Sequence, residues 1–431
     1  MDNNVNNSAG LPVGIDRLSF YTPRYKLDLE TLAQARGLNP DKFTMDLGQV
    51  SMGVIPPNED IVTMAVNAAL PIVDKERAKK IKLVLFATES AIDQAKAAGV
   101  YVHHYLGLPP DCRVVELKQA CYSLTAALQF ARAMILLNPD EEVLIIGSDV
   151  AKYEQNSVAE PTQGAGAAAM IISGNPSLVR LEGHSGLFTE HVMDFWRPPY
   201  SNHAFVSSQY SVRFYLQAME KAWKNFAEKS GLTKDEIDLA CYHTPFIRMA
   251  ENVHGKFRGN SERAQEEITP ATIYGRQIGN TYTAALYISL CSVLENSKAE
   301  SLAGKRVGLF SYGSGAVSEY FTGIIEPGYT RHLNVERHRN LLSASETCDI
   351  HTYQSFYDYT PPRDGREERP GDYKAGELRI ERFADHKRHY EWARNQKQIQ
   401  ATDQKTDTRR ETLADNPELL EKSHLRSASS Y

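Results

Sequence analysis

The sequence has few cysteines and no long apolar run. Its 431 residues include five cysteines, and no two of them form a C-x-x-C pair. Such sparse cysteines indicate a reducing compartment without disulfide bonds. No apolar stretch approaches the ~20 residues that a membrane-spanning helix needs, and the polar start, MDNNVNNSAG, lacks the basic and apolar regions of a signal peptide. We therefore expect a cytoplasmic protein that does not enter a membrane.

The chain also lacks a strong excess of one charge. It has 48 Lys and Arg residues against 54 Asp and Glu residues, which is not typical of a protein whose whole surface binds nucleic acid. We expect small-molecule partners instead. The adjacent residues His103 and His104 have no histidine or carboxylate partner at helical spacing, so the sequence predicts no metal site.

The length predicts more than one lobe, because a single hydrophobic core usually stops growing below this size. Residues 1–12 are Asn-rich and expected to be disordered, 13–175 form a first half, 176–395 a second half, and 396–431 a polar tail. Apolar strand candidates alternate with helical patterns at 82–90, 113–119, 141–149, 166–173, 239–245 and 306–313. Strands of this kind predict a mostly parallel sheet that is covered on both faces.

A short repeat indicates that the two halves are related. The tetrapeptide TAAL occurs at 125–128 and again at 283–286, each time in an apolar helix that leads toward an apolar strand and a Gly-containing turn. Four residues before the first copy is Cys121, and four before the second is Gly279, which is followed by Asn280. Duplicated halves would bring their corresponding loops to one shared cleft.

Three polar residues follow apolar segments and are candidates for chemistry. Cys121, in ELKQACYSLTAAL, opens a helix whose unpaired N–H groups can lower a thiol pKa from ~8.5 and favour the nucleophilic thiolate. Glu89 ends a strand, where open α/β sheets bind ligands, and burial can raise its pKa into the range of acid/base catalysis. His243, in LACYHTPF, has the corresponding place in the second half. The alternatives are a buried structural cysteine, a capping carboxylate and a core histidine.

Two Gly-rich segments suggest different uses. GAGAAAM, at 164–170, is similar to a dinucleotide fingerprint but leads into an apolar strand instead of opening a helix, so we predict no nicotinamide site. YGSGAVSE, at 312–319, suits a close approach of the backbone to a ligand, and its N–H groups could bind an oxyanion.

Several motifs together carry a family resemblance. They are NEDIVTM (58–64), FATESAIDQAKAA (86–98), QACYSLTAAL (119–128), EPTQGAGAAAM (160–170), DFWRP (194–198), HTPF (243–246), GNTYTAALY (279–287) and FSYGSGAVSEY (310–320). With them the sequence resembles the hydroxymethylglutaryl-CoA synthases of the thiolase superfamily, especially the bacterial type, from residue 14 to about residue 392. The resemblance implies an α/β fold of duplicated thiolase-like halves, with two mixed, mostly parallel five-stranded sheets in αβαβα layers, and a homodimer.

The resemblance also implies roles for individual residues. The catalytic trio would be Cys121 as acyl acceptor, Glu89 as acid/base and His243 beside the second substrate. The acyl and pantetheine site would be lined by further residues, namely Tyr153, Thr162, Ser211, Asn280 and Ser314. Arg248 stands where the family often has a lysine near the nucleotide end of coenzyme A, and the two side chains are not interchangeable at a phosphate.

The implied reaction condenses acetyl-CoA, held as a thioester on Cys121, with acetoacetyl-CoA, and water then releases hydroxymethylglutaryl-CoA for the mevalonate pathway. It needs no cofactor beyond the coenzyme A substrates. One alternative is the family branch that acts on β-ketoacyl chains bound to an acyl carrier protein. Others are a thiolase or ketoacyl synthase, whose pattern lacks the FATES glutamate, Glu89, and an inactive scaffold on the same fold.

Overall fold

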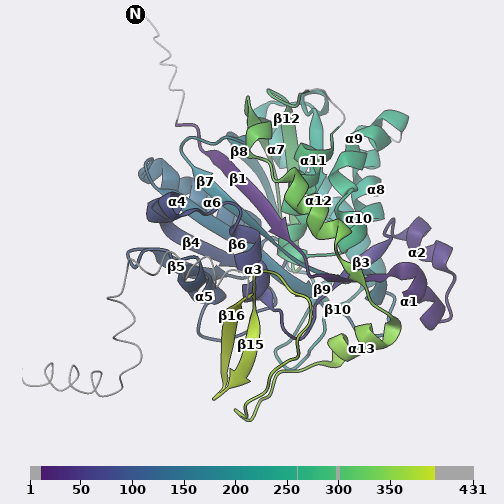
Figure 1. Cartoon of the computed structure of the whole chain (residues 1–431). Coiled ribbons are helices and arrows are strands. Elements are labelled where there is room, and N and C mark those ends of the chain that lie inside the picture. Colours follow the sequence, from purple (N-terminus) through teal and green to yellow (C-terminus); the bar gives the residue numbers. More distant parts are fainter. Residues whose placement is uncertain (1–10, 260, 298–300, 394–431) are drawn as a thin grey trace, which may run out of the picture.

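The computed structural model describes residues 11–259, 261–297 and 301–393 (Figure 1). The first ten residues and the predicted polar tail at 396–431 lie outside the described residues. Nine strands form one sheet, in the order β11-β12-β13-β8-β1-β7-β6-β4-β5. Their bounds are β1 Gly14–Tyr21, β4 Ile81–Ala87, β5 Arg113–Leu117, β6 Glu142–Ala151, β7 Gly164–Ser173, β8 Val179–Thr189, β11 Leu239–Tyr242, β12 Arg306–Gly313 and β13 Val317–Ile325.

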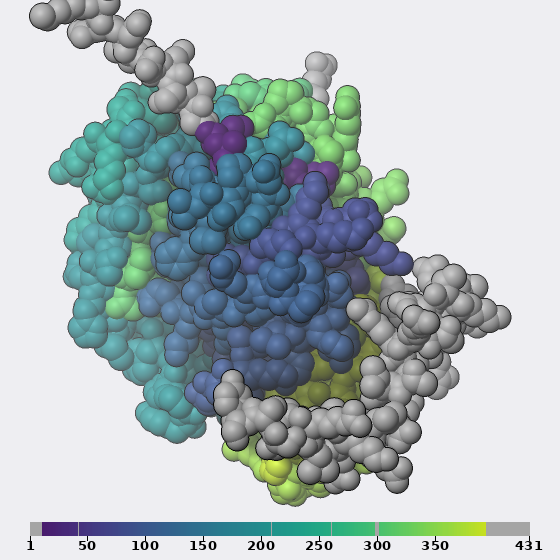
Figure 2. Space-filling view, turned by 90° about the vertical axis from the view of Figure 1, so that its left-hand side faces the viewer, coloured from purple at the N-terminus to yellow at the C-terminus, as the bar shows by residue number. Residues whose placement is uncertain are grey.

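The two halves of this sheet mirror each other. Outward from the centre, the first half runs β1, β7, β6, β4, β5, and the second runs β8, β13, β12, β11. In each half, the first strand along the chain (β1 or β8) pairs with the last (β7 or β13). The strands of the sheet that come between them in sequence lie farther out. A duplicated chain would give this shared order. Figure 2 shows the first half (blue) flanked by the second (teal). The six strands predicted from the sequence, β4, β5, β6, β7, β11 and β12, all form within a few residues of their expected bounds.

The halves join in a single sheet where the sequence predicted two. β1 and β8 pair antiparallel, with Gly14 opposite Arg180 and Ile15 opposite Val179. A Cβ at position 14 would lie 2.0 Å from the Val179 carbonyl oxygen, so this junction requires glycine. The second half contributes four strands in the described residues, one fewer than predicted.

The predicted excess of parallel strands is also absent from the described sheet. Three of its eight pairings are parallel, namely β4 with β5, β4 with β6, and β11 with β12, and the other five are antiparallel. Helices cover both faces of the sheet, so its strands are apolar throughout whichever way they run. The apolar composition of the strands therefore predicted correctly that they are buried, and predicted incorrectly that most of them are parallel.

Helices cover both faces of the first half. On β6, the Ser148 hydroxyl donates to the Ile61 carbonyl of α3 (Ile61–Ala69) at 2.7 Å. The neighbouring residue, Gly147, faces Leu124 of α6 (Ser123–Leu137). Successive residues of a strand point to opposite faces, so α3 covers one face and α6 covers the other.

The second half is built in the same way. On β12, the Phe310 ring lies 5.4 Å from the Tyr215 ring of α7 (Ser208–Ser230), whereas Ser311 accepts the Thr125 hydroxyl of α6 at 2.8 Å. α11 (Ala285–Asn296) lies beside α6, since Tyr287 and Thr125 share a 2.8 Å hydrogen bond. The layers are α3, strands, α6 with α11, strands, and α7, which confirms the αβαβα thiolase-like class.

Smaller elements surround this core. Short strands form a three-stranded sheet of β14 (Glu346–Thr347), β2 (Tyr25–Asp28) and β3 (Ser51–Val54), and two pairs, β9 (Phe195–Trp196) with β10 (Phe205–Val206) and β15 (Leu378–Ala384) with β16 (Lys387–Trp392). The remaining α-helices are α1 Leu29–Ala35, α2 Pro40–Asp46, α4 Lys75–Lys80, α5 Ala98–Tyr105, α8 Ile247–Arg258, α9 Glu262–Thr272, α10 Gly275–Ile278, α12 Val335–Ser343 and α13 Ile350–Asp358. Short 3₁₀ turns are η1 Glu160–Thr162, η2 Lys234–Glu236, η3 Tyr282–Ala284 and η4 Tyr329–His332.

The helix α6 is more apolar than we expected from the sequence, in which we found no stretch long enough to span a membrane. With the turn before it, the window Ala120–Leu137 is, within the described residues, the one helix long and apolar enough to cross a membrane by length and composition. Its inner face is occupied, however, because Leu124, Leu128 and Ile135 are fully buried against the sheet. Small and aliphatic residues here fill the layer between two sets of strands, as in the core helix of a globular fold.

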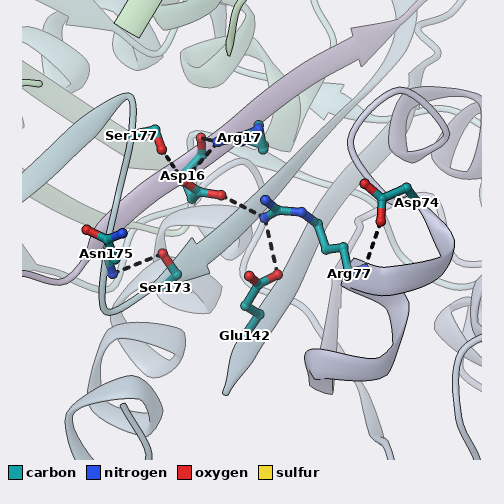
Figure 3. Close-up of polar contacts among 8 residues, drawn as sticks. All are labelled: Asp16, Arg17, Asp74, Arg77, Glu142, Ser173, Asn175 and Ser177. Atoms are coloured by element: carbon teal, nitrogen blue, oxygen red, sulfur yellow. Dashed lines mark hydrogen bonds and ion pairs between the residues drawn. The ribbon is translucent and has the colours of Figure 1, made fainter. Parts of the chain in front are cut away.

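A charged cluster joins α4 to the sheet (Figure 3). Arg77 contacts Asp16 of β1 at 2.7 Å and Glu142 of β6 at 3.2 Å. Ser177 donates to the same Asp16 at 2.6 Å, and Asp74 caps α4 by accepting the Arg77 backbone N–H at 2.8 Å. Hydrogen bonds to charged groups contribute about 1.5–3 kcal/mol each, so the cluster ties α4 to the beginnings of both strands.

Candidate active site

The structure brings Cys121 and Glu89 into direct contact. Glu89 follows the end of β4, and Cys121 stands two residues before α6, where β5 has just ended. Because β4 and β5 are parallel neighbours, both residues lie at the same edge of the sheet. The Cys121 Sγ donates to Glu89 Oε1 at 3.1 Å. Ala120 before it has a φ of 42°, a left-handed conformation that costs a residue with a Cβ and persists only where neighbours hold it.

The surroundings of this pair raise the pKa of the Cys121 thiol, whereas the sequence predicted a lowered pKa and an activated thiolate. Burial, and then the adjacent Glu89 carboxylate, raise the pKa of Cys121 well above its usual value. Burial, and then Asp149, raise the pKa of Glu89 to about 8. The sequence predicted a lowered thiol pKa from the helix N-terminus, and that prediction is wrong, because a desolvated site with an acid in contact disfavours a second negative charge. Cys121 is a thiol whose proton can pass to Glu89.

Asp149 positions Glu89 and was not found from the sequence. It lies fully buried in β6 and accepts the Glu89 backbone N–H at 2.8 Å and the Thr88 hydroxyl at 2.8 Å. Its other oxygen accepts the hydroxyl of Thr283, from the second TAAL copy, at 2.6 Å. The sequence did contain a signal for Asp149, because an acidic residue ends the otherwise apolar strand segment VLIIGSD. The carboxylate therefore ties the Glu89 loop to the other half.

His243 comes from the second half, just after β11. Its N–H donates to the Phe310 carbonyl at 2.8 Å, and its carbonyl accepts the Tyr215 hydroxyl at 2.6 Å. The ring is buried, and its Nδ1 has no hydrogen-bond partner among the described residues. Burial lowers the pKa of His243 to about 3, so the imidazole is neutral and one ring nitrogen is open to a ligand.

One cavity collects most of the predicted residues. It has a volume of about 580 Å³, and we call it the cysteine cavity. Its wall includes Cys121, His243, Tyr153, Thr162, Ser211, Asn280 and Ser314. Apolar and aromatic side chains form most of the remaining lining, as in sites for small molecules with a few convergent polar groups.

Two predicted site residues do not line this cavity: Glu89, which reaches it only through its contact with Cys121, and Arg248. The Arg248 Nε donates to the Met45 carbonyl at 3.1 Å, and its guanidinium pairs with Glu251. It lies beside the cavity, since its backbone N–H donates at 2.9 Å to the carbonyl of Leu47, which is part of the wall. Its guanidinium is turned toward a separate polar hollow.

The end of β12 and the Gly-rich turn after it pack against the residues that flank Cys121. A Cβ at Gly313 would lie 2.5 Å from the Gln119 carbonyl oxygen, so only glycine permits this approach. Gln119 also donates to the Ser314 carbonyl at 3.2 Å. The Gly315 N–H, which the sequence offered as an oxyanion donor, instead donates to Asp194 at 2.9 Å. An oxyanion role for the other N–H groups of this segment stays a prediction.

Two residues of the DFWRP motif support the site. Asp194 is fully buried and also accepts the Tyr312 hydroxyl at 2.5 Å, which fixes the Gly-rich turn. The Arg197 guanidinium donates to the Glu89 backbone carbonyl. The sequence marked this motif by resemblance without assigning its residues a role, because their contacts are with loops distant along the chain.

A second group of ligand-type side chains lies away from the site. Cys291, Glu295 and His338 are close enough to share an ion. The His338 ring is already engaged, because its Nδ1 donates to Glu295 at 2.8 Å and its Nε2 accepts the Phe20 N–H at 3.3 Å. This group is a hydrogen-bonded link between α11, α12 and β1, and the predicted absence of a metal stays a prediction.

A thiol and a neutral imidazole in the wall of one cavity, with a proton acceptor in contact with the thiol, suit covalent catalysis. The N-terminal model of hydroxymethylglutaryl-coenzyme A synthase matches residues 10–177, and the C-terminal model of the same family matches residues 252–360. The chain belongs to the hydroxymethylglutaryl-coenzyme A synthase family. It is an acyl-transferring condensing enzyme.

Three relatives show how far the similarity extends. The hydroxymethylglutaryl-CoA synthase of Enterococcus faecalis is 40% identical over 80% of this chain and 92% of its own length. The polyketide biosynthesis 3-hydroxy-3-methylglutaryl-ACP synthase PksG of Bacillus subtilis is 33% identical over 75% of this chain and 84% of its own. A crystal structure of an HMG-CoA synthase complexed with CoA superposes with a TM-score of 0.85 and 34% identity over 89% of this chain and all of that one.

Glu89 sets the reactivity of the thiol, which predicts the effect of removing its charge. In Glu89→Gln, the second cause of the raised Cys121 pKa disappears, so that pKa falls and more thiolate is present at a given pH. We expect the midpoint for alkylation of Cys121 by iodoacetamide to move to lower pH. Mass spectrometry of the Cys121 peptide at a series of pH values measures it.

Cys112 serves as the internal control in that experiment. It is half-buried, its pKa is raised to about 11 by burial, and Glu89 is not among the causes, so its alkylation should not respond to the substitution. An unchanged Cys121 midpoint in Glu89→Gln would show that burial alone controls the thiol.

Proposed function

We propose that this chain is a hydroxymethylglutaryl-CoA synthase that joins an acetyl group to the ketone of an acetoacetyl thioester and supplies the mevalonate pathway. The observation that carries the proposal is the 3.1 Å contact of the Cys121 thiol with Glu89, in a site where His243 and Asn280 of the other half face the same cysteine cavity. These residues are the ones that the family resemblance assigns to the reaction.

The first step transfers the acetyl group to the chain. Glu89 takes the thiol proton, Cys121 attacks the acetyl-CoA carbonyl, and the proton leaves with the coenzyme A thiolate. A carboxyl group with a pKa of about 8 exchanges protons readily near neutral pH, which suits a group that must both accept and return one.

The second step forms the carbon–carbon bond. A thioester makes the acetyl methyl protons removable, and Glu89 takes one to give an enolate. The enolate carbon attacks the acetoacetyl ketone, whose oxygen becomes an alkoxide. His243 is neutral, so it stabilises the alkoxide by hydrogen bonding with Asn280, and the proton comes from protonated Glu89. Groups of this kind typically contribute ~10²- to 10⁴-fold to a rate.

The last step frees the cysteine. Water adds to the thioester carbonyl, Glu89 accepts a water proton, and the Cys121 thiolate leaves and takes the proton back. The product carries a new carboxylate at this end and remains a coenzyme A thioester at the other.

The roles of Cys121 and Glu89 separate in a labelling experiment. Cys121→Ser should leave no acid-stable label on the protein after incubation with labelled acetyl-CoA, because the thioester cannot form. Glu89→Ala should still be acetylated, because loss of the carboxylate lowers the Cys121 pKa and water can take the thiol proton in its place. It should fail to condense, because no base remains to take the methyl proton. Intact-protein mass spectrometry records the adduct, and release of hydroxymethylglutaryl-CoA records turnover.

Either assignment can fail on its own. Normal labelling of Cys121→Ser would refute the nucleophile, and a Glu89→Ala protein with full condensation would remove Glu89 as the base. Cys112→Ser is the matched control, since Cys112 lies outside the cysteine cavity and its loss should change neither readout.

We propose coenzyme A as the carrier of both acyl groups. Support comes from the higher identity to the Enterococcus faecalis hydroxymethylglutaryl-CoA synthase than to the Bacillus subtilis hydroxymethylglutaryl-ACP synthase. An acyl carrier protein is the second candidate, favoured by that latter relative. We expect kcat/KM for acetoacetyl-CoA to exceed that for an acetoacetyl carrier protein, and the reverse order would favour polyketide branching.

We propose further that the enzyme works in the cytoplasm without a metal or other cofactor. The five cysteines are all free, which suits a reducing compartment. The reaction needs only the proton transfers described above, so dialysis against a chelator should leave turnover unchanged.

We also propose a homodimer through the outer edge of β5. This strand ends the sheet, and it carries Val115, which is 46% exposed. Phe130 of α6 is also exposed. An unpaired apolar edge invites a second strand. The wild-type protein should sediment as a dimer and Val115→Arg as a monomer.

Leu38 offers a matched control for the dimer. It is likewise 46% exposed, and it lies between α1 and α2 on the opposite side of the molecule from β5 (Figure 1). Leu38→Arg should remain a dimer. Wild-type protein with the mass of one chain would refute the proposal.

A further inference from the structure

Glu89 has a second cavity behind it. This hollow of about 790 Å³, which we call the rear cavity, has Glu89, Ser90 and Arg197 in its wall, whereas Cys121 lines the cysteine cavity. Phe195 of β9 is in the wall of both. Glu89 therefore lines the rear cavity and contacts a thiol that lines the cysteine cavity.

The proposed reaction makes two spaces necessary. When the carbon–carbon bond has formed, the acyl chain is a thioester of Cys121 at one end and of coenzyme A at the other. The pantetheine arm then fills the cysteine cavity at the moment when water must reach the Cys121 thioester. A water that arrives by the same route would have to pass the tethered chain.

The rear cavity has the features of a water-filled path. Its wall includes Glu59, which is 5% exposed and whose Oε2 has no hydrogen-bond partner among the described residues. A buried polar atom of this kind is normally satisfied by an ordered water. Outward, the cavity shares Ala91 and Asn202 with an adjoining cavity of about 470 Å³, and Ala91 is exposed.

Glu59 is also suited to hold a proton on this path. Its Oε1 accepts the Tyr21 hydroxyl at 2.6 Å, which leaves Oε2 for water. Burial raises the pKa of Glu59 to about 7, so near neutral pH it exists in both protonation states.

We propose that the rear cavity delivers the hydrolytic water to Glu89 while the pantetheine arm still occupies the cysteine cavity. The inference rests on the proposed function. The step balances: water gives its proton to Glu89 and its oxygen to the acyl carbon, the carbon–sulfur bond breaks, and Cys121 recovers the proton.

Blocking the mouth of the rear cavity tests the proposal. In Ala91→Trp, acetylation by acetyl-CoA should be retained, because that substrate enters by the cysteine cavity. With both substrates, the variant should accumulate an adduct with the mass of hydroxymethylglutaryl-CoA less one water, and kcat should fall by about tenfold or more. Quenched samples analysed by intact-protein mass spectrometry show the adduct.

Val158→Trp is the matched control at the other mouth. Val158 is 80% exposed and lines the cysteine cavity, so this variant should show a raised KM for acetyl-CoA with no accumulated adduct. Gln94→Trp, also at the rear cavity, repeats the test if tryptophan at position 91 prevents acetylation.

Different outcomes would contradict the water route and the proposed function on which it rests. Rear-cavity variants with wild-type kcat and no adduct, or equal accumulation in Val158→Trp, would overturn the water route. Wild-type protein that forms no acetyl adduct on Cys121 would instead overturn the proposed function.

Discussion

The contact between the Cys121 thiol and the Glu89 carboxyl group is the constraint on which the site depends. Two acidic groups 3.1 Å apart in a desolvated place cannot both be ionised without a large cost, so they share a proton. Burial and the Glu89 carboxylate keep the thiol protonated, because they raise its pKa well above the usual value. Burial and Asp149 raise the pKa of Glu89 to about 8, whereas the hydrogen bond from Cys121 lowers it. The contact thus couples the nucleophile to the base.

Maintaining that contact takes groups from both halves. Asp149 holds the Glu89 loop and is itself held by Thr283, while Asp194 fixes the turn that packs against the residues that flank Cys121. The two TAAL segments have different roles. The first follows the nucleophile, Cys121, and the second supplies Thr283, which hydrogen-bonds to the carboxylate that holds the Glu89 loop. A duplicated fold therefore provides one asymmetric site at the meeting point of its two copies.

The sequence predicted the parts that depend on local pattern. Glu89 and Cys121 follow parallel neighbouring strands whose ends meet at one sheet edge, so their convergence follows from periodicity and topology. His243 follows β11, at the other end of the sheet, and its place at the same cleft was predicted only from the relation between the two halves. An acid at the end of an apolar strand could have marked Asp149, but the contacts of Asp149 and Asp194 could not be predicted, since their partners are far away in the chain. The thiol pKa was predicted with the wrong sign because a helix terminus is visible in a sequence and desolvation is not. Arg248 was placed by resemblance near the nucleotide end of coenzyme A, and that role stays a prediction; its side chain pairs with a neighbour on its own helix, Glu251.

The junction at Gly14, where β1 runs beside β8, has a consequence for the origin of the fold. A single-copy ancestor would have ended at that strand and exposed its unpaired backbone groups, an arrangement prone to self-association. Two such ancestors meeting edge to edge would already have possessed the continuous ladder seen in the present chain. Fusion of the genes would then have made an intermolecular seam permanent and freed the two copies to specialise.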